Sequence, residues 1–144
     1  MRTPYDAALR ALGRDMDALK TLIADATARL DGMHTLHEAL TTQIARETEL
    51  SAVEWQLHAD AYLARAREER RRLESLRHDA EVELTMLRRK AAQQYASIRA
   101  VGGAADTFRA EAERKLQSAE QAMLDDLTAA RFVRRARELR RART

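Results

Sequence analysis

The stretch YDAALRALGRDMDALKTLIADATARLDGMHTLHEALTTQI, residues 5–44, decides the fold of this chain. Its apolar positions follow one another at gaps that alternate between four and three residues, with one polar exception: Tyr5, Leu9, Leu12, Met16, Leu19, Ile23, Ala26, Leu30, Met33, His37, Leu40 and Ile44. A repeat of about 3.5 residues holds one face of a helix against another helix in a left-handed coiled coil. The stretch therefore predicts a long helix packed along a second one.

Composition points the same way. Charged residues make up 34% of the 144 residues and aromatic residues only 4%, which is typical of long helices and not of a bulky core. The chain has no cysteine, and hence no disulfide or thiolate metal site. No apolar run approaches the roughly 18 residues of a membrane span, and the first residues lack a signal-peptide pattern. We therefore expect a soluble, cytoplasmic, all-α protein with a single coiled-coil domain over residues 1–144.

The bounds of the helices follow from capping signals. Thr3 and Pro4 suit the start of a helix over residues 4–47. Ser51 precedes Glu54 at capping-box spacing, which predicts a turn at about 48–53 and a second helix over residues 54–140.

Gly102-Gly103 is the strongest helix-breaking signal. The apolar spacing continues across it, which favours an uninterrupted or kinked second helix over a turn into a third helix.

The second helix is expected to present a stripe with an eleven-residue rhythm that includes Leu73, Leu76, Leu84 and Tyr95. A turn near residue 50 would place Ile44 opposite residue 57 and leave the second helix without a partner beyond about residue 100. The predicted fold is an antiparallel two-helix coiled-coil hairpin with a longer second helix.

No residue pattern indicates catalysis. His34 and His37 lack the further ligands of a metal site. The acidic pairs Glu68-Glu69 and Asp125-Asp126 point about 100° apart on a helix, so salt bridges to nearby arginines are expected instead of acid–base chemistry. Nucleotide-binding and nucleophile motifs are absent from the sequence. We expect no enzyme, no catalytic residue, no metal and no cofactor.

The positive charge is concentrated in one region. Residues 130–144 carry seven arginines and one glutamate, whereas the rest of the chain carries a small negative net charge. Such a segment suits an acidic protein surface, nucleic acid or anionic lipid. The lack of interleaved aromatic residues for base stacking argues against nucleic acid.

Trp55 and Tyr62 flank the predicted turn. They either close the end of the hairpin by packing against it or form an exposed contact for a partner.

Two stretches resemble a known family. Residues 59–70, ADAYLARAREER, are similar to the aromatic-led start of the second helix in the FliJ-type stalk/chaperone proteins of flagellar type III export. Residues 123–131, MLDDLTAAR, are similar to the acidic stretch that precedes basic residues near that family's C-terminus. The family is related to the YscO-type stalks of injectisomes. Gly102-Gly103 departs from its pattern.

The resemblance implies a hairpin like the central stalk of rotary ATPases, and a role in coupling an export ATPase hexamer to an export-gate membrane protein, with secretion chaperones as further partners. The protein would then be peripheral to the inner membrane through that apparatus. Gate binding would fall near the hairpin end, at Trp55, Tyr62 and Leu63. ATPase binding would fall on the following C-terminal residues: Leu124, Asp125, Asp126, Arg131, Arg134 and Arg135.

Two other interpretations stay open. One is a structural adaptor, either a generic coiled coil or a three-helix bundle folded at Gly102-Gly103. The other is a nucleic-acid-binding coiled coil that uses its arginines.

Overall fold

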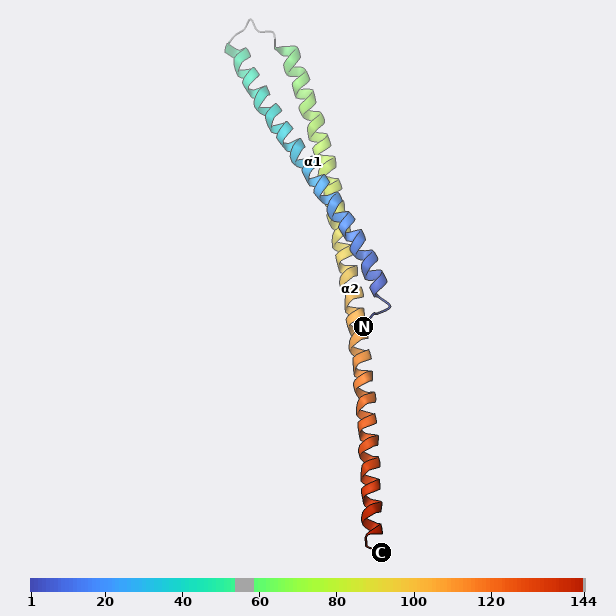
Figure 1. The fold of residues 1–144 in the computed structure, drawn as a ribbon. Coiled ribbons are helices and arrows are strands. Elements are labelled where there is room, and N and C mark those ends of the chain that lie inside the picture. Colours follow the sequence, from blue (N-terminus) through green and yellow to red (C-terminus); the bar gives the residue numbers. More distant parts are fainter. Residues whose placement is uncertain (54–58, 144) are drawn as a thin grey trace. The chain divides into compact units, whose positions relative to one another are not determined.

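The computed structural model describes residues 1–53 and 59–143. It contains two helices, α1 (Asp6–Val53, 48 residues) and α2 (Asp60–Arg141, 82 residues), and its described residues form no strand (Figure 1). The expected all-α, antiparallel two-helix hairpin with a longer second helix is confirmed. The chain divides into two compact units, Ala11–Ile98 and Met1–Arg10 with Arg99–Thr144.

The apolar seam of α1 packs as its spacing predicts. Every seam residue from Leu9 to Ile44 is buried or half-buried, and Met16, Ala26 and Ile44 are the most enclosed. The polar exception, His37, is half-buried as well, and its Nε2 lies 3.0 Å from Oε1 of Glu74 on α2. Because an ionised carboxylate only accepts hydrogen bonds, the imidazole nitrogen is the donor.

The predicted turn at 48–53 is wrong, because those residues form the last turns of α1. No glycine or proline breaks the helix there, and the hydroxyl of Thr48 donates to the carbonyl oxygen of Ile44 within the helix (2.7 Å). Ser51 lies inside α1, and its buried hydroxyl has no hydrogen-bond partner in the described structure, so it does not start a helix. In the described residues the second helix begins at Asp60 rather than at 54.

The later end of α1, at Val53, and the later start of α2, at Asp60, shift the pairing of the helices. Ile44 forms a cluster with Leu63 and Ala66, well past the predicted partner position 57, which lies outside the described residues. Farther along the same unit, the side-chain amide of Gln94 donates to the carbonyl oxygen of Leu12 (3.1 Å). In both contacts the residue of α1 meets a residue farther along α2 than the sequence suggested.

The stripe of α2 also differs from the prediction. Leu76 and Tyr95 are 40% and 56% exposed. The buried and half-buried residues instead follow alternating gaps of four and three, the same heptad repeat as in α1: Ala59, Leu63, Ala66, Arg70, Leu73, Arg77, Ala80, Leu84, Leu87, Ala91, Gln94 and Ile98. The expected eleven-residue repeat is wrong. It was drawn from apolar residues alone, whereas three of the heptad positions are occupied by polar residues whose long apolar stems pack against α1.

α2 passes through Gly102 and Gly103 without interruption, and neither glycine has a positive φ angle. The favoured interpretation of a continuous helix is confirmed, and the described residues contain no third helix. The described part of the chain also contains no helix that is long and apolar enough to cross a membrane.

Candidate functional site

The residues expected at the hairpin end do not share one surface. Leu63 is only 5% exposed, because it packs in the cluster with Ile44 and Ala66. Its expected role as a contact for a partner is therefore corrected to a role in helix packing. Tyr62, its neighbour in the first turn of α2, is 36% exposed and available to a partner. Trp55 lies outside the described residues.

A second candidate surface lies on the C-terminal part of α2. We call residues 113–140 the exposed segment, since every residue in it except Ala136 is exposed. Leu116, Met123 and Leu127 are each more than half exposed, and their spacing places them within about 40° of one another around the helix. The apolar stripe predicted past residue 100 is therefore present, and in its later part no other described residue covers it.

The six residues expected to bind an ATPase fall on different sides of α2. Leu124, Arg131 and Arg135 follow one another at gaps of seven and four residues, so they lie within about 40° of each other. Arg134 lies beside this line. Asp125 and Asp126 point about 100° and 200° away from Leu124. The structure thus brings Leu124, Arg131 and Arg135 together on one side, whereas Arg134 lies about 80° from Leu124 and the acidic pair lies farther round the helix.

The arginines among these six residues are not neutralised by any described residue. Arg131, Arg134 and Arg135 make no ion pair or side-chain hydrogen bond with any described residue, and neither does Asp126. Asp125 accepts a hydrogen bond from Gln121 (2.9 Å) instead of pairing with Arg131. The expected salt bridge between the acidic pair and Arg131 is therefore wrong.

The acidic pair Glu68-Glu69 behaves as expected. Arg71 pairs with Glu68 at 3.2 Å and Arg72 with Glu69 at 2.9 Å, each three residues away on the same helix. The hydrogen bond from Arg72 lowers the pKa of Glu69. These groups are satisfied locally, which distinguishes them from the arginines of the exposed segment.

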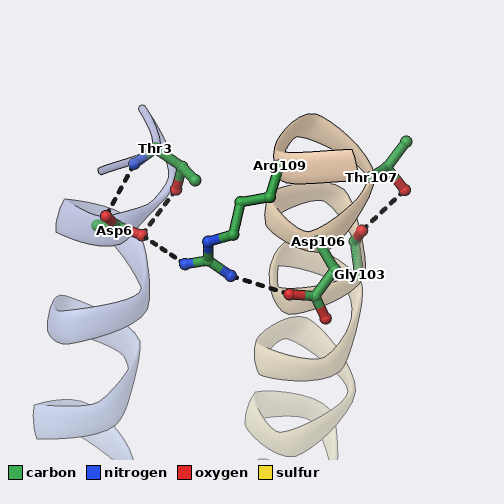
Figure 2. A network of polar contacts seen from close by, with 6 residues as sticks. All are labelled: Thr3, Asp6, Gly103, Asp106, Thr107 and Arg109. Carbon is green, nitrogen blue, oxygen red and sulfur yellow. Dashed lines mark hydrogen bonds and ion pairs between the residues drawn. The ribbon is translucent and has the colours of Figure 1, made fainter. Parts of the chain in front are cut away.

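A group of contacts that sequence reasoning missed marks the last part of α2 that the N-terminal residues contact; Figure 2 shows four of its residues, Thr3, Asp6, Asp106 and Arg109. Arg109 on α2 donates to Asp6 at the start of α1 (3.2 Å) and to Asp106 on its own helix (2.9 Å). The backbone and hydroxyl of Thr3 donate to the same Asp6 carboxylate (2.8 and 2.7 Å). Beside these contacts, the rings of Tyr5 and Phe108 meet edge to face with centroids 6.4 Å apart. We call these six residues the N-terminal clasp.

Through the clasp, the N-terminal residues contact α2 as far as about residue 109. The sequence had predicted that these intramolecular contacts would end near residue 100. The two aromatic residues at apolar stripe positions were the signal in the sequence. They could be matched with each other only once the ends of the two helices were known.

Hydrogen bonding lowers the pKa of three carboxyl groups, which predicts a loss of stability in acid. The chief causes are the Thr3 hydroxyl on Asp6, the Arg72 guanidinium on Glu69 and the His37 ring on Glu74. Since the folded pKa lies below the unfolded one, this stabilisation is present above the unfolded pKa of about 4 and is lost as pH falls through the folded pKa. We expect the thermal melting temperature to fall below pH of about 4, and to fall less steeply in the Asp6→Asn variant. A melting temperature that rises as pH is lowered from about 5 would contradict this.

Comparison of the chain with models of known protein families, with curated proteins and with solved structures finds no match.

Proposed function

We propose that this protein is a non-enzymatic stalk and adaptor of a bacterial type III export apparatus, of the flagellar or the injectisome kind. It would connect an export ATPase ring to an export gate, act in the cytoplasm at the inner membrane, and also escort secretion chaperones. The exposed segment carries the proposal: a long helix presents apolar side chains and unpaired arginines that no described part of the chain covers. The resemblance of residues 59–70 and 123–131 to FliJ-type proteins names the system.

The residues of the proposed ATPase contact are Leu124, Arg131 and Arg135, which share one side of α2, and Arg134, which lies about 80° from Leu124. Asp125 and Asp126 are proposed as separate contacts on the other sides, since a helix inside a ring is surrounded by the partner. Acidic groups in the ring would pair with the arginines, and the apolar stripe would pack on the ring wall.

A binding assay with the immobilised export ATPase tests this assignment. We expect the triple variant Arg131→Glu, Arg134→Glu, Arg135→Glu to bind at least ten times more weakly than the unchanged chain. The matched control reverses the same number of charges elsewhere on α2, at Arg88, Arg89 and Lys90, which are exposed. Equal losses in both triple variants would show that total charge, not this surface, governs binding.

A truncation after Glu113 provides a second arm, because it removes all of the exposed segment except its first residue and keeps the N-terminal clasp. If this truncated chain still bound the ATPase, the assignment of the ATPase contact to the exposed segment would be wrong.

The gate contact is proposed at Tyr62 and at Trp55, of which Tyr62 is exposed in the first turn of α2. We expect Tyr62→Ala to weaken binding to the cytoplasmic domain of the gate protein. Tyr95→Ala serves as the control, because Tyr95 is also an exposed tyrosine on α2 but lies far along the helix. The assignment fails if the two variants bind alike.

A second candidate function is nucleic-acid binding, which the unpaired arginines favour. It predicts an affinity for duplex DNA or RNA that decreases steeply with salt concentration and is lost in the Arg131/Arg134/Arg135 variant. The absence of binding at low salt would dismiss it.

A further inference from the structure

The last turns of α2 carry a second exposed apolar surface, distinct from the stripe of Leu116, Met123 and Leu127. Phe132 and Leu139 are 76% and 61% exposed. Together with Ala136 they follow gaps of four and three residues, which places the three side chains within about 60° of one another. This group points to the side of the helix roughly opposite to Leu116. We call it the terminal apolar face.

Arginines surround the terminal apolar face in an ordered way. Arg135 and Arg140 lie about 40° beyond its two edges, Arg131 lies about 80° beyond the edge at Leu139, and Arg134 lies on the opposite side of the helix. Residues 130–144 contain seven arginines and one glutamate. The segment is therefore a basic amphipathic helix with exposed phenylalanine and leucine on its apolar side.

The length and chemistry of the terminal apolar face distinguish between the kinds of partner that could bind it. It spans only about two helical turns, which is too short for a coiled-coil seam that must repeat over several heptads. Nucleic acid would pair with the arginines but would leave Phe132 and Leu139 exposed to water. A bilayer with anionic headgroups accepts both features, because apolar side chains enter the acyl boundary while long arginine side chains reach the phosphates.

We propose that residues 129–142 bind directly to the surface of an anionic phospholipid bilayer, with the terminal apolar face turned into the membrane. The arginines at the edges of the face contact lipid phosphates, and those on the far side add attraction to the negative surface. This contact goes beyond the proposed function, in which the chain reaches the membrane only through its partners. It needs neither the ATPase nor the gate.

Co-sedimentation of the full chain with lipid vesicles tests the proposal. We expect binding to vesicles of phosphatidylcholine with about one third phosphatidylglycerol, at least ten times tighter than to pure phosphatidylcholine, since each arginine near an anionic surface adds attraction. The double variant Phe132→Ala, Leu139→Ala should bind at least ten times more weakly. The matched control Leu116→Ala, Leu127→Ala removes two exposed apolar side chains from the other side of the same helix and should bind as the unchanged chain does.

Three results would overturn the proposal. One is equal affinity for the neutral and anionic vesicles. Another is an equal loss in the two double variants, which would mean that the side of the helix is irrelevant. The third is tighter binding to duplex DNA or RNA than to anionic vesicles, unchanged in the Phe132/Leu139 variant, which would assign the segment to nucleic acid. Circular dichroism of each variant establishes that the helices persist.

Discussion

Replacement of Leu84 by alanine is expected to lower the free energy of unfolding by about 2 kcal/mol or more, because a leucine buried between the helices loses its packing and leaves a cavity. Leu84 is 4% exposed and occupies a heptad position of α2 in the unit Ala11–Ile98. A two-helix seam has few such enclosed side chains, so each one carries a large share of the total stability. Urea unfolding followed by circular dichroism measures the change.

Leu116→Ala is the matched control for this experiment. Leu116 is the same residue type on the same helix but is 55% exposed, so the change in helix propensity is equal and the loss of burial is small. We expect a change within about 0.5 kcal/mol, as for a surface substitution. If Leu116→Ala destabilised the chain as much as Leu84→Ala, the exposed segment would have to be packed against something in solution, such as a second copy.

The second large effect is a gain of stability. The double variant Gly102→Ala, Gly103→Ala is expected to raise the free energy of unfolding by about 1–2 kcal/mol, since each glycine inside a helix costs roughly 1 kcal/mol relative to alanine. Both residues lie within α2 with ordinary negative φ angles, and an added Cβ would meet no atom within 4 Å at either position. Thermal unfolding followed by circular dichroism tests it.

Gly13→Ala is the companion variant, because Gly13 also lies within a helix and has the same open surroundings. It should stabilise α1 by a similar amount for one residue. A double variant at 102 and 103 that melts at a lower temperature, while Gly13→Ala melts higher, would show that the glycine pair serves a need of its own, such as a bend of α2 in solution.

The sequence predicted α1 well and α2 less well, for a physical reason. In α1 nearly every seam position is apolar, so the repeat is visible without knowledge of the partner. In α2 the seam includes Arg70, Arg77 and Gln94, whose long side chains pack their stems and keep their polar ends near water. A search for apolar residues alone therefore assigned Leu76 and Tyr95 to the seam, although both are exposed.

The position of the turn could not be read from residues 48–53, because a capping-box spacing also occurs inside helices. A turn placed too early shifts every cross-helix pair, so the ion pair of Asp6 with Arg109 was unforeseen. The exposed segment and its arginines were foreseen, since they depend on composition and on the length of α2 alone. The separation of Asp125 and Asp126 from Leu124 around the helix required only the helical repeat and was missed.

The polar contacts between α1 and α2 within the unit Ala11–Ile98 oppose sliding of one helix along the other. A shift of α1 along α2 by one heptad would preserve the apolar spacing and would therefore cost little hydrophobic contact. In one direction, however, Arg29 would leave Glu83, now 3.3 Å away, and approach Lys90. In the other direction His37 would leave Glu74 and approach Arg67. The few charged pairs thus select one register among several that the apolar repeat alone permits, and they oppose slippage of the helices under an axial load.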